Sequence, residues 1–250
     1  MDAPTETHMD FEAARQRLIV ALDVSSRRDA LRLADRLIEV VGCFKIGLQA
    51  FTSQGPALVK ELTDRGGRVF LDLKMHDIPN TVAAGVEAAA GLGIEFLTIH
   101  TLGGPAMLKA ARSGADRSGN ARLKLLGVTV LTSLDASELA SVGLPTDVRV
   151  LAPRLAKLAQ SAGLDGIVCS PQDLAHLPKQ DQGGFLRVTP GVRPAGAASQ
   201  DQLRAATPEV AIRAGATHLV VGRPILQSHD PKEAAVQIVE AIRHARMEVK

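Results

Sequence analysis

The run RVFLDLKMHDIPNT, residues 68–81, contains the pattern that decides the fold. Its first half, residues 68–74, is dominated by apolar residues and is typical of a buried strand, whereas Pro79 is a residue type tolerated in the first turn of a helix. A strand followed directly by a helix is a βα unit, and repeated βα units build parallel sheets covered by helices. The number of such units in the chain therefore sets the architecture.

Eight strand-like runs alternate with helical stretches along the chain. The runs occupy residues 18–24, 43–47, 68–74, 94–100, 124–132, 165–170, 186–191 and 217–222. The predicted helices include residues 28–41, 56–65, 79–92, 105–117, 148–162, 208–214 and 231–246. Successive runs are spaced by about 28 residues, which suits a (β/α)8 barrel of ~250 residues better than an open doubly wound sheet. We therefore predict an α/β, single-domain (β/α)8 TIM barrel over residues 18–250, preceded by an N-terminal arm at residues 1–17.

Composition excludes several classes of protein. The 250 residues are 46% hydrophobic and carry 29 Lys and Arg against 27 Asp and Glu, so the net charge of +2 is too small for a nucleic-acid footprint. Six Phe with no Trp or Tyr give no stacking platform for single strands. No apolar run approaches the ~18 residues of a membrane span, and the N-terminus is too acidic for a signal peptide. We expect a cytoplasmic protein without membrane or nucleic-acid partners, in which Cys43 and Cys169 are reduced core residues.

Polar residues stand at or just beyond the ends of nearly all the predicted strands. In a barrel, the C-terminal strand ends and the loops after them build the active site. Strand ends also emerge into water, so any one of these residues has an ordinary explanation, but the set as a whole favours a site. Its members are Asp23, Lys45, Asp72, Lys74, His100, Thr132, Ser170, Arg193, Gly222 and Arg223.

The sharpest cluster lies within the run quoted first. Asp72 and Lys74 are two apart on a strand, so both side chains should point to one side, and Asp77 follows before the helix begins. This D-x-K-x-x-D spacing alone is weak evidence and is also compatible with a salt-bridged strand end. Lys45, at the end of another strand, would complete an array of alternating charges in the barrel mouth. Charges gathered there are costly to desolvate, so we interpret the array as catalytic.

A second constellation lies after the last strand, in VVGRP at residues 220–224. The glycine at 222 lets backbone N–H groups approach an anion, and Arg223 supplies a forked donor. Loops after strands seven and eight are the usual phosphate position of this fold, so the pattern predicts a phosphorylated substrate. An arginine extending from a surface loop is the alternative, and it applies more strongly to Arg193 taken alone.

These motifs together resemble the orotidine 5′-phosphate decarboxylase family. The resemblance rests on ALDV, FKIG, FLDLKMHDIPNT, VTVLTS, GIVCS, VTPGVRP and VGRPI, at residues 21–24, 44–47, 70–81, 128–133, 166–170, 188–194 and 221–225. It covers nearly everything except the N-terminal arm, and DLKxHDIPNT is far more specific than the bare charge spacing. Met75 stands where the family often has Phe, which is a packing position.

The resemblance implies cofactor-free and metal-free conversion of orotidine 5′-monophosphate to UMP and CO2 in pyrimidine biosynthesis. It implies a homodimer with shared sites, in which Lys74 donates a proton to C6 and a lid at residues 191–202 closes. The implied catalytic set is Lys74, Asp72, Asp77 and Lys45. Asp23 and Lys45 would bind the ribose, Thr132 the pyrimidine and Arg193, Gln202, Gly222 and Arg223 the phosphate, while Ile78, Thr81 and Asp77 would cross into the partner's site.

Two other functions fit parts of the pattern. Phosphosugar decarboxylases and hexulose-phosphate synthases share the D-x-K-x-x-D barrel but use Mg²⁺, and Lys45 with the HDIPNT stretch favours the nucleotide enzyme over them. A non-catalytic sensor of a phosphoribosyl ligand would have little reason to keep the whole charge array. His100 is as compatible with a core position as with a role in the array, so we leave it outside the catalytic set.

Overall fold

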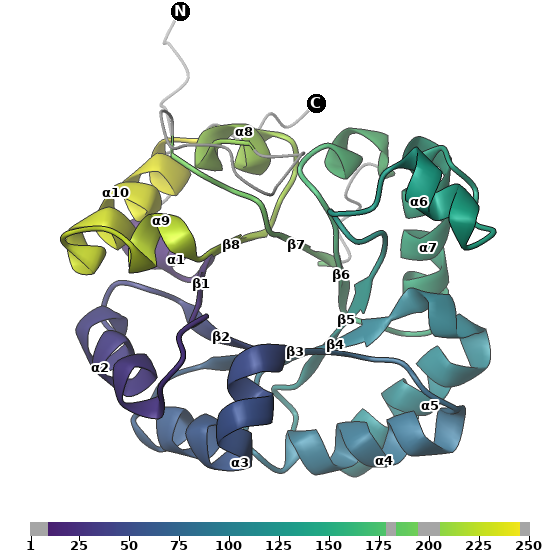
Figure 1. Cartoon of the computed structure of the whole chain (residues 1–250), viewed down its shortest axis with the longest axis horizontal. Helices are drawn as coiled ribbons and strands as arrows, with labels where there is room; N and C mark the ends of the chain where they lie inside the picture. Colours follow the sequence, from purple (N-terminus) through teal and green to yellow (C-terminus); the bar gives the residue numbers. More distant parts are fainter. Residues whose placement is uncertain (1–9, 179–183, 195–205, 246–250) are drawn as a thin grey trace, which may run out of the picture.

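Eight parallel strands close into a barrel in the computed structural model, which describes residues 10–178, 184–194 and 206–245. Each strand pairs with the next one in the chain, and β8 pairs with β1 to complete the ring (Figure 1). The strands are β1 (Leu18–Ala21), β2 (Cys43–Gly47), β3 (Val69–Met75), β4 (Phe96–His100), β5 (Lys124–Val128), β6 (Gly166–Val168), β7 (Leu186–Thr189) and β8 (His218–Val221). The predicted (β/α)8 barrel is confirmed.

Helices surround this ring on its outside (Figure 1). They are α1 (Phe11–Arg15), α2 (Arg27–Leu37), α3 (Leu48–Asp64), α4 (Pro79–Ala90), α5 (Gly104–Arg117), α6 (Ala136–Ser141), α7 (Val148–Ser161), α8 (Pro208–Arg213), α9 (Arg223–Leu226) and α10 (Pro231–His244), with short 3₁₀ turns η1 (Thr101–Gly103) and η2 (Asp173–His176). Within the described parts of the chain, none of these helices is long and apolar enough to cross a membrane.

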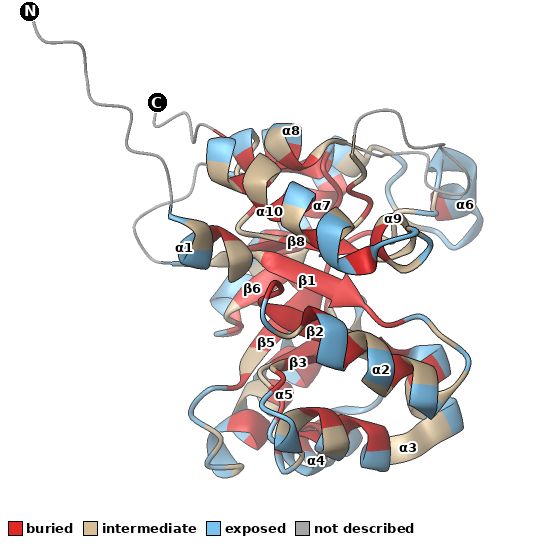
Figure 2. Cartoon of the chain, turned by 90° about the vertical axis from the view of Figure 1, so that its left-hand side faces the viewer, coloured by how far each residue is buried: buried red, intermediate tan, exposed pale blue. Residues whose placement is uncertain are grey.

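The strands are buried on both faces, as Figure 2 shows by their red colour. Alternate residues point outward to the helices and inward to the barrel axis, as the period of a strand requires. The inward residues form a compact apolar cluster made of Ile19, Ala21, Cys43, Phe70, Phe96, Leu126, Val188 and Val220. Phe70 and Phe96 meet edge to face, with ring centroids 5.9 Å apart. This cluster fills the barrel and forms the floor on which the polar strand ends stand.

Several predicted element boundaries are wrong, among them the start of α3 and the end of β5. The helix expected at residues 56–65 begins at Leu48 instead, and its path is broken at Gly55, where φ is 64° and the backbone is not helical. Pro56 follows this break and begins the second helical segment. In the first turn of a helix the missing N–H of proline removes no hydrogen bond within the helix. The fifth strand ends at Val128, and residues 129–132 already belong to the loop above the barrel. The helix expected at residues 231–246 extends to His244, and Arg246 lies outside the described residues.

The predicted N-terminal arm contains structure. α1 packs against α10, and its Ala14 is fully buried. Arg15 Nη1 donates to the backbone oxygens of Ile38 and Val41, at 3.2 and 3.0 Å, which fastens α1 to the end of α2. Residues 1–9 lie outside the described part, so the division at residue 18 stays a prediction.

The tight contact between α4 and α5 gives a test of the packing. A Cβ added at Gly114 would lie 2.3 Å from the backbone oxygen of Ala83, which cannot move aside as a flexible side chain would. In an ordinary helix interior, replacing Gly by Ala stabilises by about 0.5–1 kcal/mol. Here we expect Gly114→Ala to lower the free energy of unfolding by about 1–3 kcal/mol in denaturant titrations.

The exposed neighbour Ser113 on the same helix supplies the control, because Ser113→Ala introduces a methyl side chain with no such clash. A Gly114→Ala protein at least as stable as the unchanged chain would show that the two helices are not packed as described.

Candidate active site

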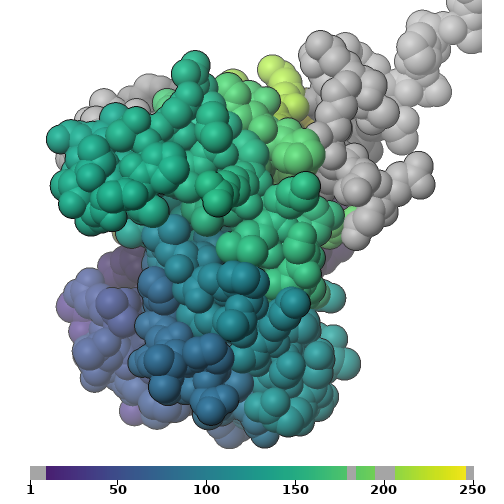
Figure 3. Space-filling model, turned by 90° about the vertical axis from the view of Figure 1, so that its right-hand side faces the viewer, coloured from purple at the N-terminus to yellow at the C-terminus, as the bar shows by residue number. Residues whose placement is uncertain are grey.

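A cavity of about 790 Å³ opens at the C-terminal ends of the strands. In Figure 3 this end of the barrel is at the left, where a hollow separates the α6 region above from residues near 50 below. The cavity is lined by strand ends and loops from both halves of the barrel. The polar residues among them include Asp23, Lys45, Asp72, Lys74, Thr132, Arg193, Arg223 and Gln227. Most of the predicted site residues therefore come together in one place.

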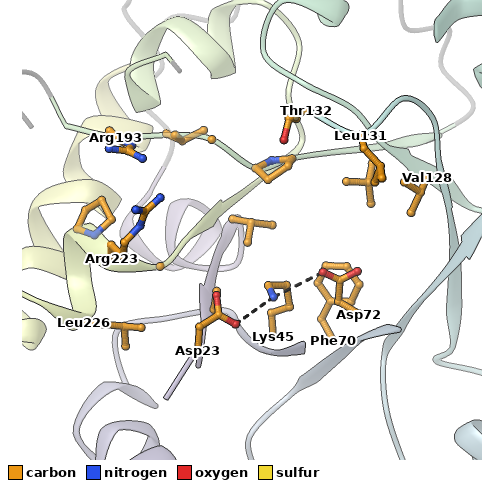
Figure 4. A pocket seen from close by; sticks show the side chains of 18 of the residues that line it. Asp23, Lys45, Phe70, Asp72, Val128, Leu131, Thr132, Arg193, Arg223 and Leu226 are labelled. Atoms are coloured by element: carbon orange, nitrogen blue, oxygen red, sulfur yellow. Dashed lines mark ion pairs between the residues drawn. The ribbon is translucent and has the colours of Figure 1, made fainter. Parts of the chain in front are cut away.

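A chain of ion pairs crosses the floor of the cavity. Lys45 Nζ lies 3.5 Å from Asp23 Oδ1 and 3.5 Å from Asp72 Oδ2, as the dashed lines in Figure 4 mark. On the other side of Asp72, its Oδ1 accepts a hydrogen bond of 2.9 Å from Lys74 Nζ. Lys45 and Asp72 are nearly buried, whereas the Lys74 side chain is 39% exposed. The carboxylate of Asp72 thus sits between two ammonium groups, one of which reaches the open cavity.

The environment keeps Asp72 ionised. Burial by itself raises the pKa of this carboxyl group, but the charges of Lys45 and Lys74 and the hydrogen bonds from Lys74 and Thr98 outweigh it. The net result is a pKa below the ordinary value for aspartate. At neutral pH the floor of the cavity therefore holds a permanent negative charge between its two lysines.

A backbone irregularity places Lys74. It has a φ of 50°, the only positive φ of a non-glycine residue among those that the structure describes. The pairing of β3 with β4 shifts here, from Leu71 opposite Leu97 to Met75 opposite Ile99. Between these two pairs, β3 contains two residues more than β4. The alternation of side chains along a regular strand therefore does not by itself predict the direction of the Lys74 side chain. The side chains of Asp72 and Lys74 nevertheless meet, with Lys74 Nζ 2.9 Å from Asp72 Oδ1.

Thr98 is the residue that the sequence analysis missed. Its hydroxyl donates to Asp72 Oδ1 at 3.0 Å and accepts from the backbone N–H of Lys74 at 2.8 Å. The signal was present, because alternation along β4 puts Phe96, Thr98 and His100 on the inward face. The sequence analysis singled out the strand's last residue, His100, instead of the inward residue next to Asp72.

Two arginines occupy the opposite side of the cavity. Arg193, just beyond β7, and Arg223, the first residue of α9, lie together in Figure 4, away from Asp72. Gly222 also lines this side. Arg193 is held by its backbone, since its N–H donates to the oxygen of Ala206 at 3.0 Å. Gln202 and most of the predicted lid, residues 195–202, lie outside the described residues.

Three predicted residues do not line this cavity. Asp77, Ile78 and Thr81 stand at the start of α4 and are exposed, with Ile78 at 67%. The carboxylate of Asp77 accepts a hydrogen bond of 2.6 Å from the backbone N–H of Ile78. The predicted array was Lys45, Asp72, Lys74 and Asp77. In the structure Asp72 pairs with Lys45 and Lys74, Lys45 also faces Asp23, and Asp77 lies outside the cavity.

Two other strand-end residues have local roles. His100 stacks on His76 with ring centroids 5.4 Å apart, and burial, His76 and Lys74 lower the pKa of His100, which favours its neutral form. Ser170 is fully buried and exchanges hydrogen bonds with Asp173, which closes the turn after β6. In the described residues, no three His, Cys, Asp or Glu side chains are grouped as a metal site requires.

Fold and site together define the class. A (β/α)8 barrel with paired lysines and aspartates on the floor of its C-terminal mouth, and two arginines across from them, has the arrangement typical of a barrel enzyme. A family model described as "Orotidine 5'-phosphate decarboxylase / HUMPS family" matches residues 16–238. The chain belongs to this family.

Individual relatives agree with the family. A protein of Halorhodospira halophila named orotidine 5′-phosphate decarboxylase is 50% identical over 229 residues, which are 92% of this chain and 97% of that protein. One of Rhodopseudomonas palustris with the same name is 48% identical over 94% of this chain and 97% of its own length. The crystal structure of orotidine 5′-phosphate decarboxylase from Lactobacillus acidophilus superposes with a TM-score of 0.79 at 39% identity, covering 90% of this chain and 98% of that one.

The buried position of Asp72 leads to a prediction on stability. Because its native pKa lies below the ordinary value, its charged form stabilises the fold at pH above the unfolded pKa, and this contribution is lost as pH falls through the native pKa. Asp72→Asn removes the negative charge that lies between the Lys45 and Lys74 ammonium groups. We therefore expect the free energy of unfolding at pH 7 to fall by about 3 kcal/mol. The deficit should shrink as the pH is lowered, in denaturant titrations at several pH values.

Asp64→Asn is the matched control, since Asp64 pairs with Lys60 on an exposed turn of α3 and should cost less than about 0.5 kcal/mol. An Asp72→Asn deficit that stays constant from pH 7 to acid would contradict the electrostatic explanation.

Proposed function

We propose that the protein decarboxylates orotidine 5′-monophosphate to UMP and CO2. The observation that carries this proposal is the Lys74 ammonium, held 2.9 Å from the Asp72 carboxylate and reaching an open cavity. Family membership and relatives of that name at 45–50% identity support the choice of substrate. On the sequence grounds given first, we keep the cytoplasm as the expected compartment.

The two sides of the cavity suit the two ends of this substrate. The phosphate would bind Arg193 and Arg223 with the backbone around Gly222, because guanidinium groups form forked hydrogen bonds to phosphate oxygens. The ribose would lie over Lys45 and Asp23, and Thr132 would face the pyrimidine from the loop after β5. We assign Gln202 to the phosphate as well, on the resemblance alone. The reacting carbon then falls over Lys74.

Electrostatic stabilisation would carry the reaction. Loss of CO2 from C6 leaves an electron pair in the plane of the pyrimidine ring, where it cannot spread into the ring carbonyls. A fixed ammonium beside C6 stabilises that charge as it develops, and such preorganised groups usually supply the largest catalytic contribution. Asp72 holds the ammonium in place, and the apolar layer of Phe70 and Phe96 beneath keeps the surroundings of low polarity.

The step balances without a redox partner. The bond between C6 and the carboxylate carbon breaks, the carboxylate leaves as CO2, and its electron pair remains on C6. A proton moves from Lys74 Nζ to C6 and gives UMP, after which the neutral amine takes up a proton from water. No residue changes its oxidation state, and the proposal requires neither a metal nor an organic cofactor.

We further propose that the protein works as a homodimer with shared sites. Asp77, Ile78 and Thr81 are exposed at the start of α4, beside the strand that carries Asp72 and Lys74. Ile78 is a large apolar residue with 67% of its surface exposed, and contact with a partner subunit would bury it. In the proposed dimer these three residues enter the neighbouring subunit's cavity, and Asp77 completes the charge array there.

A metal-dependent phosphosugar reaction is the second candidate, because the family description includes that branch. Mg²⁺ is bound by carboxylate oxygens with open coordination positions. Here Asp72 Oδ1 accepts from Lys74 and Thr98, and Asp72 Oδ2 faces Lys45. The carboxylate best placed to hold a cation is surrounded by hydrogen-bond donors, which favours the nucleotide reaction.

Removing the proposed proton donor tests the function. We expect Lys74→Ala to abolish release of CO2 from orotidine 5′-monophosphate while UMP binding stays measurable by calorimetry, because the phosphate and ribose contacts remain. Lys60→Ala, on the exposed face of α3, should leave turnover unchanged. Turnover by the unchanged chain should survive EDTA, whereas a Mg²⁺ enzyme would lose it. Near-normal turnover by Lys74→Ala would remove Lys74 from its role.

The shared site predicts complementation between two inactive proteins. Lys74→Ala and Asp77→Asn should each be inactive alone. When equal amounts are refolded together, half of the dimers are mixed and each mixed dimer has one intact site, so about a quarter of normal activity should return. Activity no greater than the sum of the separate proteins would argue against sites shared between subunits.

A further inference from the structure

We propose that Thr98 is a positioning residue for the reaction, whose single hydroxyl sets both the backbone of Lys74 and the carboxylate of Asp72. The proposal rests on the proposed function, because it assigns a role relative to the proton donor of that reaction. Thr98 does not line the cavity, so it is not expected to contact the substrate.

The position of Thr98 suits such a role. It is the third residue of β4, it is fully buried, and it follows Phe96 on the inward face. Phe96 belongs to the apolar cluster that fills the barrel, so Thr98 stands directly above that cluster and next to Asp72 on the neighbouring strand. A polar side chain buried at this depth needs hydrogen-bond partners, and its hydroxyl has two in the neighbouring strand.

The first partner is the backbone of Lys74. The register of β3 against β4 shifts between Leu71 and Met75, and Lys74 lies within this interval. The backbone N–H of Lys74 donates to Thr98 Oγ1 at 2.8 Å. The threonine hydroxyl therefore holds the backbone at the residue with a φ of 50°, a conformation that costs energy unless its surroundings hold it.

The second partner fixes the rotation of a carboxylate. A hydroxyl has one proton, and with Lys74 N–H as its donor neighbour that proton is available for Asp72 Oδ1 at 3.0 Å. The same oxygen accepts from Lys74 Nζ, while Oδ2 faces Lys45. Turning the carboxylate about its Cβ–Cγ bond would move both lysine contacts at once. The hydroxyl thus connects the backbone of Lys74, the orientation of Asp72 and the position of the Lys74 ammonium.

Thr98→Val tests the hydroxyl alone, because valine has nearly the same shape and no donor or acceptor. We expect kcat for orotidine 5′-monophosphate to fall by about 10²-fold, the effect of a misplacement of about 1 Å at a reacting group. The affinity for UMP should change by less than about threefold, because the phosphate and ribose contacts are untouched. Thr98→Ser keeps the hydroxyl and should retain most of the kcat.

The pH profile supplies a readout that a purely structural role would not move. The Thr98 hydrogen bond is one of the interactions that lower the pKa of Asp72. Without it the pKa of Asp72 rises toward its ordinary value, so the acidic limb of kcat/KM should move to higher pH in Thr98→Val and stay in place in Thr98→Ser.

Thr101→Val is the matched control. Thr101 is also fully buried, and its hydroxyl donates to the backbone oxygen of Val128 at 2.6 Å without touching Asp72 or Lys74. It should lose stability comparable to that of Thr98→Val but keep its kcat. If Thr98→Val does not fold, Thr98→Cys against Thr98→Ser makes the same comparison, because a thiol is a weak donor and acceptor.

Equal kcat in Thr98→Val and the unchanged chain would overturn the proposal, as would equal losses in Thr98→Val and Thr101→Val or in the cysteine and serine variants. An assay of the unchanged chain shows whether the role of Thr98 or the proposed function itself is wrong. If the unchanged chain releases no CO2 from orotidine 5′-monophosphate, the function is wrong, whereas activity in every variant contradicts only the role of Thr98.

Discussion

The pairing of Asp72 with two lysines is the interaction on which the rest of the site depends. The Asp72 carboxylate lies between the apolar cluster that contains Phe70 and Phe96 and the open cavity. Two ammonium groups this close would repel each other strongly without the anion between them. With the anion present, the Lys74 ammonium is held in place at the edge of the cavity, and in the proposed reaction such a fixed charge would stabilise an electron pair without reorganisation of water.

Barrel closure explains how the two ends of the site meet. Asp23, Lys45 and Asp72 belong to β1–β3 or the residues just after them, and Arg193 and Arg223 follow β7 and β8. The pairing of β1 with β8 brings these distant segments of the chain around one cavity. A phosphorylated substrate of suitable length would then be held by its phosphate on one side while its reacting carbon lies over the other, so remote binding energy can contribute at the reacting centre.

Much of the fold and most of the site follow from the sequence, for reasons that particular residues illustrate. Eight apolar runs at regular spacing predict the barrel. Asp23 and Arg223 follow the ends of β1 and β8 as expected, whereas Lys45 lies in the middle of β2. The capping box of Asp135 and Glu138 was a readable signal for α6 that the sequence analysis overlooked.

The bulge at Lys74 has no such signal, because it arises from the register between β3 and β4, which alternation along one strand does not encode. Thr98 was missed for a related reason. Its contacts are with Asp72 and Lys74 on the neighbouring strand, and the sequence of β4 alone does not show which residues of β3 lie beside it. The place of Asp77 outside the cavity depends on where α4 begins relative to the barrel axis, and its proposed role needs a second chain.

A crystal structure of the protein with UMP bound tests the central claim most directly, through the distance between Lys74 Nζ and C6 of the pyrimidine. The account predicts that the ammonium lies about 3–3.5 Å from C6, close to the ring plane, while still contacting Asp72. An Nζ atom more than about 5 Å from C6, or a nucleotide bound with its pyrimidine turned away from Lys74, would be beyond the reach of proton transfer and would contradict the account.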